Sequence, residues 1–258
     1  MTASVSTRGM KCACFTDEER EKMYIESLTY YSSLNWSDKQ VIIFVENSGW
    51  DLDRIKSSIV PCRNLEIEYI SLPPDLFDIS KGKGYNELLL INNAIEKSDN
   101  IKGACGFIKA TGRYPIYNIQ YFMQKMNRFI IENGGELYID IKDHKLYDWL
   151  HLGWCGHSAS VVLFAVTTGF YKGKIGCRYS ELNDYEGNLL EGLMFDVVKA
   201  NVKERRISTR FPREYHPGGL EGSNIDAVSF SKKHDSFKGK AKRFVGNFIR
   251  IFLPFFKF

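Results

Sequence analysis

The sequence predicts an α/β fold in which helices cover a mostly parallel central sheet. Strand and helix patterns alternate through the first two-thirds of the 258 residues, an order typical of this class. Several strand segments are continuous apolar runs, as expected for strands that are buried on both faces. The hydrophobic share of 44% and the charged share of 26% are ordinary for a soluble globular chain, so we expect one sizeable core.

The first elements show the pattern clearly. Residues 3–6 form a possible first strand, and Thr16 can cap a helix that extends to Tyr31, with acidic residues in its first turn. Residues 41–45 are β-branched and aromatic and predict a buried strand. The later elements follow in order: a helix at 51–58, a strand at 65–72, a helix at 86–97, a strand at 106–108, a helix at 119–132, strands at 137–141 and 161–166, and a helix at 188–202.

The end of the chain has a different composition. Residues 232–258 hold eight basic residues and one acid, a net charge of +7; because the whole chain carries +4, the remainder is at −3. Apolar residues recur at helical spacing from Phe237 to Phe252, with lysines and arginines between them. This pattern predicts an amphipathic helix that binds an anionic membrane surface. The alternatives are a helix docked on the body and an arm that binds nucleic acid. We therefore divide the chain into a body, 1–229, and a membrane-association tail, 230–258.

Targeting signals and cysteines bear on location. No run reaches the roughly eighteen apolar residues of a spanning helix, and residues 1–10 lack the apolar stretch of a secretory signal. The six cysteines are scattered without a Cys-x-x-Cys pair, which fits reduced thiols. We expect a cytoplasmic protein at the inner face of the plasma membrane.

Two segments suggest an anion-binding pocket. Residues 107–114 predict a strand that ends in a tight turn carrying Lys109 and Arg113. Upstream, the glycine-rich turn at 81–84 opens a helical pattern. Together they would form a cationic pocket, rich in backbone N–H groups, that suits a diphosphate. The alternative is that the cations are solvated and the glycines only make turns.

Three motifs carry a family resemblance. Glu46-Asn-Ser-Gly49, Gly82-Lys-Gly-Tyr-Asn-Glu87 and Lys109-Ala-Thr-Gly-Arg-Tyr114, in this order, resemble the small bacterial glycosyltransferases of capsule and O-antigen loci over roughly residues 15–225. The resemblance implies a GT-A-type, Rossmann-like fold. It also implies transfer of a hexose, such as galactose, from a UDP-linked donor to a lipid-linked glycan in surface polysaccharide synthesis, with retention of anomeric configuration.

The same resemblance leads to a prediction about whether catalysis needs a bound metal ion. GT-A enzymes typically place Asp-x-Asp after a strand to hold a divalent ion on the donor diphosphate, whereas this chain has Lys109 to Arg113 at that point. Fixed cations can stabilise a leaving diphosphate as a metal does. We therefore predict metal-independent catalysis in which Lys109 and Arg113 take this role. The competing hypothesis is a divalent cation bound by Asp140 and Asp143.

Further residues are assigned to the site. Glu191, on the late helix where family members place an acid facing the acceptor, is expected to act as general base or to stabilise an oxocarbenium-like centre. The residues expected to contact the donor, besides Lys109 and Arg113, are Arg8, Glu46, Asn47 and Ser48 for the nucleoside, Lys83, Gly84, Glu87 and Thr111 for the sugar and phosphates, and His216 in a loop that could close over it.

Two other classes of function stay open. The chain could be a non-enzymatic α/β module whose cations contact anionic lipid or nucleic-acid phosphates, or a nucleotidyltransferase, which would need metal-binding carboxylates. The row of phenylalanines in the tail favours a membrane over nucleic acid, because phosphate binding does not need them. The expected partners are a nucleotide sugar, a lipid-linked glycan and the membrane surface, and not nucleic acid.

Overall fold

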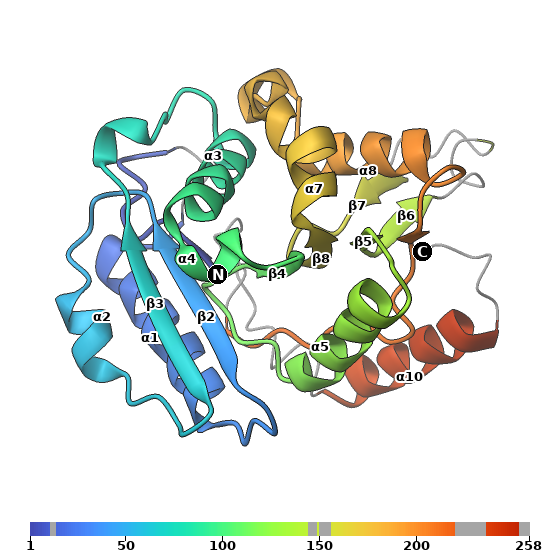
Figure 1. Ribbon diagram of the computed structural model, residues 1–258, viewed down its shortest axis with the longest axis horizontal. Coiled ribbons are helices and arrows are strands. Elements are labelled where there is room, and N and C mark those ends of the chain that lie inside the picture. Colours follow the sequence, from blue (N-terminus) through green and yellow to red (C-terminus); the bar gives the residue numbers. More distant parts are fainter. Residues whose placement is uncertain (11–13, 144–148, 150–155, 220–235, 253–258) are drawn as a thin grey trace.

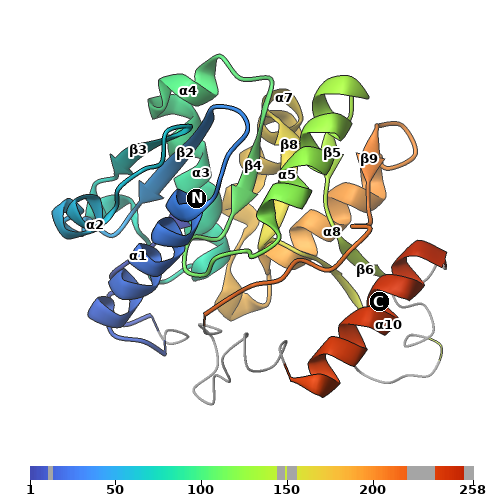
Figure 2. The same cartoon turned by 90° about the horizontal axis from the view of Figure 1, so that it is seen from below.

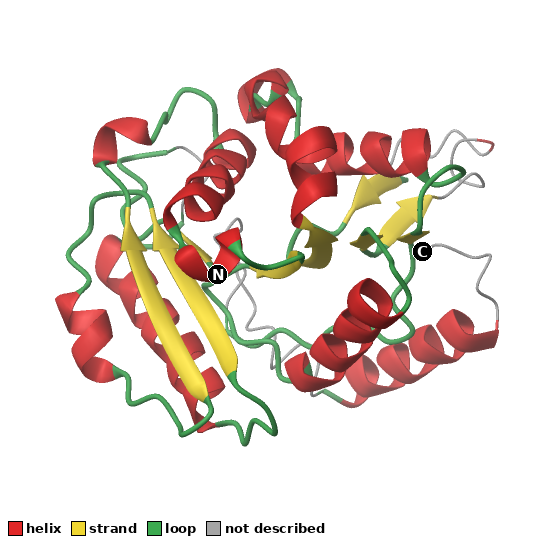
Figure 3. Cartoon of the chain, in the orientation of Figure 1, coloured by secondary structure: helices red, strands yellow, loops and turns green. Residues whose placement is uncertain are grey.

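The computed structural model describes residues 1–10, 14–143, 149, 156–219 and 236–252. It confirms the α/β class: a three-stranded parallel sheet and a mixed sheet lie side by side, with helices packed around both (Figures 1 and 3). The strands are β1 (Thr2–Ala3), β2 (Gln40–Glu46), β3 (Leu65–Ser71), β4 (Gly106–Ala110), β5 (Leu137–Tyr138), β6 (Ile141–Asp143), β7 (His157–Ala159), β8 (Leu163–Thr167) and β9 (Ile207–Ser208).

The helices follow the predicted order, with additional short turns. The α-helices are α1 (Asp17–Ser33), α2 (Asp53–Ser58), α3 (Lys83–Lys97), α4 (Asp99–Lys102), α5 (Ile119–Asn127), α7 (Thr168–Phe170), α8 (Leu190–Asn201) and α10 (Phe237–Phe252). The 3₁₀ and π turns are η1 (Pro74–Leu76), η2 (Arg128–Glu132), η3 (Tyr171–Ile175), η4 (Gly176–Glu181) and η5 (Asp184–Glu186). The helix expected at 119–132 therefore ends at Asn127 and continues as a π turn.

The first sheet has the order β1-β2-β3, and all its strands are parallel. Figure 1 shows α1 and α2 on one side of it and α3 on the other. Tyr24, Leu28 and Phe44 are buried between α1 and β2. Thr16 and Glu19 form a capping box that starts α1, as the sequence indicates. Because parallel strands end at one edge, the loops after β1, β2 and β3 lie together there.

The second sheet departs from the predicted parallel arrangement. Its order is β4-β8-β5-β9, and β8 runs antiparallel to both of its neighbours. A single parallel bridge between Thr2 and Thr111 joins it to the first sheet, and the Gly112 N–H donates to the Thr2 carbonyl. The loop after β4 therefore lies beside the loop after β1, and this contact positions the candidate site.

Helix α10 packs against the body through polar residues (Figure 2). The Arg250 guanidinium binds both Asp140 carboxylate oxygens at 2.8 and 2.9 Å, and Asn247 accepts a bond from the Glu214 N–H. The opposite face is apolar and open: Phe237 is 90% exposed and Phe244 is 74% exposed. The helix predicted for the tail thus exists, with Arg243, Asn247 and Arg250 turned toward the body and its lysines exposed. The predicted boundary near Ser229 lies outside the described residues and stays a prediction.

Candidate functional site

The candidate site lies where the carboxyl ends of β1, β2 and β4 meet the first turns of α3 and α8. The bridge between Thr2 and Thr111 brings the first and the fourth strand together. A Cβ atom added to Gly84 would lie 3.1 Å from Leu190 Cβ, so the amino-terminal ends of α3 and α8 are in close contact. Three strand ends and two helix ends therefore surround one region.

Glu46, at the end of β2, organises the loops around it. Its side chain is fully buried, and its oxygens accept bonds from the N–H groups of Val5 at 3.1 Å, Ser48 at 2.8 Å and Trp50 at 3.2 Å. It also accepts a bond from the Ser48 hydroxyl. A buried carboxylate needs such a set of donors. Glu46 thus fixes the loops after β1 and β2 relative to each other.

The other residues assigned to the nucleoside lie at the same edge. Asn47 Oδ1 accepts a bond from the Ser4 hydroxyl at 2.6 Å, and Ser48 Oγ accepts one from the Ser6 N–H at 3.0 Å. Arg8 is exposed, has a left-handed φ of 48°, and donates from Nη1 to the Pro74 carbonyl at 2.8 Å. The structure brings these residues together, with Asn47 and Ser48 supporting the loop that carries Arg8.

Lys109, assigned to the leaving diphosphate, is buried inside the protein. Its Nζ contacts Glu87 Oε1 at 2.6 Å, Thr111 Oγ1 at 3.0 Å and the Val161 carbonyl. An ammonium group has three donors, so this lysine has none left for a phosphate. Glu87 also accepts a bond from the Thr2 hydroxyl at 2.9 Å. Lys109, Glu87 and Thr111 therefore form a structural link between β4, α3 and β1.

The helix start assigned to the phosphates is occupied by a carboxylate of the protein itself. Asp184 accepts bonds from the Lys83 N–H at 2.7 Å and from the Gly84 N–H at 3.3 Å. Gly82 has a φ of 86°, and a Cβ atom there would lie 2.5 Å from the Asp184 side chain. The assignment of the Lys83 and Gly84 amides to a phosphate is therefore corrected: in this structure they bind Asp184.

We predict that Asp184→Ala destabilises the fold because α3 loses its capping anion. Loss of a helix N-cap costs about 1 kcal/mol, which for a chain of this size lowers the thermal midpoint by about 2–4 °C. Glu186→Ala is the matched control, since Glu186 lies in the same turn and is exposed. Thermal unfolding measures both. Equal midpoints for the two variants would contradict the capping role.

Arg113 has a hydrogen-bond donor that is not used within the described structure. It follows the β4 turn, and its Nη1 is buried without a hydrogen-bond partner among the described residues. Its neighbours are Tyr114, whose ring lies 5.8 Å from the guanidinium carbon, and Arg20, whose pKa is lowered by burial and then by the Arg113 charge. A buried guanidinium donor without a partner is unfavourable, and an anionic ligand would satisfy it.

Glu191 lies in the first turn of α8 and has an unusual environment. The residue is exposed, yet protein surrounds its carboxyl group, and this loss of solvation raises its pKa. The charges of Glu87 and Asp184 act in the same direction, while Lys109 opposes them. A reachable carboxyl with a raised pKa is suited to proton transfer at a reaction centre.

His216 belongs to the contact with α10. Its N–H donates to Asn118 Oδ1 at 2.9 Å, its ring lies 5.2 Å from the ring of Tyr117, and its Nδ1 is 3.0 Å from Arg243 Nη1 of α10. The loop therefore packs on the segment after β4. The proposed closure of this loop over the donor stays a prediction.

The competing metal site at Asp140 and Asp143 is not supported. Asp140 is paired with Arg250 and accepts a bond from the Phe211 N–H at 2.9 Å. Asp143 contacts His157 Nδ1 and Lys199 Nζ, each at 3.1 Å. In the part of the chain that the structure describes, no group of three or more His, Cys, Asp or Glu residues could hold a metal ion.

The sequence argument missed Thr2 and Asp184. Both act through partners far away in the chain: Thr2 binds Glu87, and Asp184 binds the start of α3 about a hundred residues earlier. Asp184 stands in a turn-forming segment, so the sequence indicates only a turn there.

Comparisons with known proteins give weak structural likenesses, two of which are described here. No family model and no curated protein sequence matches the chain. Mouse xyloside xylosyltransferase 1, in its apo form, has a TM-score of 0.42 at 10% identity, over 74% of this chain and 79% of that one. Core-mannan synthase A from Aspergillus fumigatus, in a Mn/GDP form, has a TM-score of 0.40 at 10% identity, over 83% of this chain and 74% of that one. Neither likeness assigns an activity to this chain.

The prediction of metal-independent catalysis is wrong. It depended on Lys109 as a cation for the diphosphate, and the three donors of that lysine are bound within the protein.

Proposed function

We propose that the chain is a glycosyltransferase that binds a nucleoside-diphosphate sugar at the carboxyl ends of β1, β2 and β4. The observation that carries the proposal is the pairing of two unlike groups in one region. Arg113 has a buried donor without a partner among the described residues, and Glu191 has a carboxyl group with a raised pKa. The charge of Glu87 contributes to the raised pKa of Glu191 and to that of Tyr114, whose ring lies 5.8 Å from the Arg113 guanidinium carbon, so Glu87 is within electrostatic range of Glu191 and of the residue next to Arg113.

Each group supplies one part of a glycosyl transfer. Breaking the bond between a sugar and a diphosphate leaves negative charge on the diphosphate and positive charge on the sugar carbon. The planar guanidinium of Arg113 is suited to bind phosphate oxygens in pairs. The carboxylate of Glu191 is suited to accept the proton of an acceptor hydroxyl or to stabilise the sugar cation. The loops held by Glu46 supply the floor on which the nucleoside would rest.

The finer assignments extend the proposal. A hexose donor such as UDP-galactose, retention of configuration, and a lipid-linked glycan acceptor in bacterial surface polysaccharide synthesis are all supported by the resemblance of the motifs at 46–49, 82–87 and 109–114. The test is a screen of UDP- and GDP-linked sugars for hydrolysis and transfer, with Mn²⁺ or Mg²⁺ present and with EDTA. Release of a nucleotide from one donor supports the proposal. Inertness toward every donor, together with salt-sensitive binding to vesicles or DNA, would favour the non-enzymatic module.

We also propose that α10 holds the protein on an anionic membrane surface. No described helix is long and apolar enough to cross a bilayer. Instead, the polar face of α10 is bound to the body through Arg243, Asn247 and Arg250, while Phe244 and Phe248 face outward. The exposed lysines of the helix are Lys238, Lys240 and Lys242. An apolar stripe flanked by lysines fits the boundary between lipid headgroups and acyl chains. This placement supports a cytoplasmic enzyme that works on a lipid-linked acceptor.

The double variant Phe244→Asp with Phe248→Asp is expected to weaken membrane binding at least tenfold. Each substitution replaces exposed apolar surface with negative charge, so both the apolar and the electrostatic attraction fall. Cosedimentation with vesicles containing phosphatidylglycerol measures the effect. Ile131→Asp is the matched control, because Ile131 is 66% exposed on η2, away from α10. Unchanged binding by the double variant would show that α10 is not the membrane contact.

A further inference from the structure

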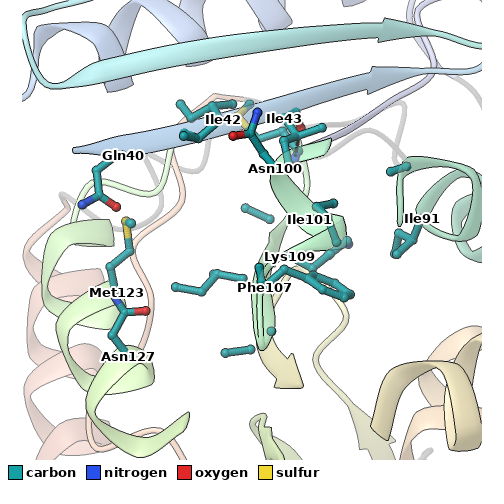
Figure 4. Close-up of a pocket in the computed structure, with 18 of the residues that line it drawn as sticks. Gln40, Ile42, Ile43, Ile91, Asn100, Ile101, Phe107, Lys109, Met123 and Asn127 are labelled. Atoms are coloured by element: carbon teal, nitrogen blue, oxygen red, sulfur yellow. Dashed lines mark hydrogen bonds between the residues drawn. The ribbon is translucent and has the colours of Figure 1, made fainter. Parts of the chain in front are cut away.

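A cavity separates the two sheets beside the amino terminus. It has a volume of about 350 Å³ and lies between β2 and β4 (Figure 4). Figure 4 shows Ile42 and Ile43 of β2 along one side and Phe107 and Lys109 of β4 along another. Helices contribute further apolar lining: Ile91 from α3, Ile101 from α4 and Met123 from α5.

The strand register explains the position of the cavity. Thr2 of β1 lies opposite Val45 of β2 and opposite Thr111 after β4, and both pairings are parallel. Counting back in this register, the position before Met1 falls opposite Ile43 and Lys109. Four such positions reach Gln40 on one side and Gly106 on the other, which are the first residues of β2 and β4. All eight residues, 40–43 and 106–109, line the cavity.

The facing edges of β2 and β4 are open. On its other side β2 pairs with β3 along its whole length, and β4 pairs with β8. Between them, in the described part of the chain, only the short β1 and the contacts of Met1 fill the gap. The N–H groups of Val45 and Asn47 donate to the carbonyls of Met1 and Ala3, so the alternating pattern turns the N–H groups of Val41 and Ile43 toward the cavity. On β4, the Gly112 N–H donates to the Thr2 carbonyl. By the same alternation, the N–H groups of Ile108 and Ala110 also point toward the cavity.

The amino group of Met1 lies at the end of this gap. It donates to the Ile43 carbonyl at 2.6 Å, where a backbone N–H of a parallel ladder would stand. Burial, and next the charge of Lys109, lower its pKa to about 5. A charged amine is poorly accommodated there, whereas a peptide N–H would fit.

We propose that the cavity is a strand-binding slot, which takes an extended apolar segment of four residues joined to Met1 and parallel to β2 and β4. Four strand residues span about 13 Å. Apolar side chains line the slot from both the α3 and the α5 side, so every position of the segment favours an apolar, β-branched residue. Occupation would convert the two sheets into one continuous sheet across β1.

The test adds residues ahead of Met1 in the full chain. One variant carries Ile-Val-Ile-Leu after an initiating Met, and its matched control carries Gly-Ser-Gly-Ser. We expect the apolar extension to raise the thermal midpoint by about 5 °C or more over the control, a shift on the scale of a few buried apolar side chains. Hydrogen exchange at the amides of Val41, Ile43, Ile108 and Ala110 should slow at least tenfold.

Two results would overturn the proposal. Equal midpoints for the two extensions, with no new amide protection, would show that the slot takes no strand. Protection of these amides in the unextended chain by free Ile-Val-Ile-Leu peptide, without any effect of the joined extension, would assign the slot to a separate partner strand.

Discussion

Replacement of Glu191 by Gln is expected to lower kcat for sugar transfer about a hundredfold or more, with little change in affinity for the nucleotide. The variant keeps the shape of the side chain but removes its charge and its basicity, and a positioned general base contributes about 10²–10⁴-fold to rate. Steady-state kinetics with the donor found in the screen, together with nucleotide titration, separate the two effects. Asp196→Asn is the matched control, since Asp196 is also exposed on α8.

The pH profile provides an independent check on Glu191. Its pKa is raised by loss of solvation and by the charges of Glu87 and Asp184. If its ionised form acts, activity is absent below this pKa and appears as pH rises through it. The acid limb of kcat/KM should therefore lie above the ordinary value of a glutamate, 4.5. An acid limb that persists unchanged in Glu191→Gln would assign the titration to another group.

Replacement of Arg113 by Ala is expected to weaken nucleoside-diphosphate binding by about tenfold to a hundredfold. Hydrogen bonds to charged groups contribute about 1.5–3 kcal/mol, and the buried Nη1 would lose its ligand. Arg113→Lys should restore only part of the affinity, because an ammonium lacks the planar pair of donors. Titration calorimetry with UDP and GDP measures both variants.

A control variant and a stability measurement test whether Arg113 acts by binding the nucleotide. Arg63→Ala removes the same charge at an exposed position between α2 and β3. Arg113→Ala should lower the thermal midpoint of the free protein by no more than a few degrees, since Nη1 has no hydrogen-bond partner to lose among the described residues and the Tyr114 ring is the contact removed. Equal nucleotide affinity in Arg63→Ala and Arg113→Ala would show that Arg113 does not bind the nucleotide.

Local pattern was sufficient to predict most of the elements. The apolar run at 41–45 forms β2, as predicted, although only Phe44 and Val45 of the run are buried and residues 41–43 are half-buried along the cavity. The capping residues Thr16 and Glu19 correctly mark the start of α1. These signals lie within a few residues of the structure they specify, so sequence alone contains them.

Long-range pairing is what the sequence could not supply. From the sequence, Lys109 is predicted to be an accessible cation. In the fold, its Nζ lies 2.6 Å from Glu87 Oε1. The glycine turn at 82–84 is likewise predicted to bind a phosphate, whereas in the fold its amides bind Asp184. The apolar face of α10 was evident from its spacing, whereas its outward direction is decided by the bond from Arg250 to Asp140, 110 residues away.

The most direct test of the proposed site is hydrogen exchange with and without UDP or GDP, in the presence of Mn²⁺. We predict slower exchange in the loops after β1, β2 and β4, at residues 4–8, 46–50 and 111–114, and in the first turn of α8. Protection confined to other regions, or no change with either nucleotide, would contradict the proposal that the carboxyl ends of these strands bind a nucleotide sugar.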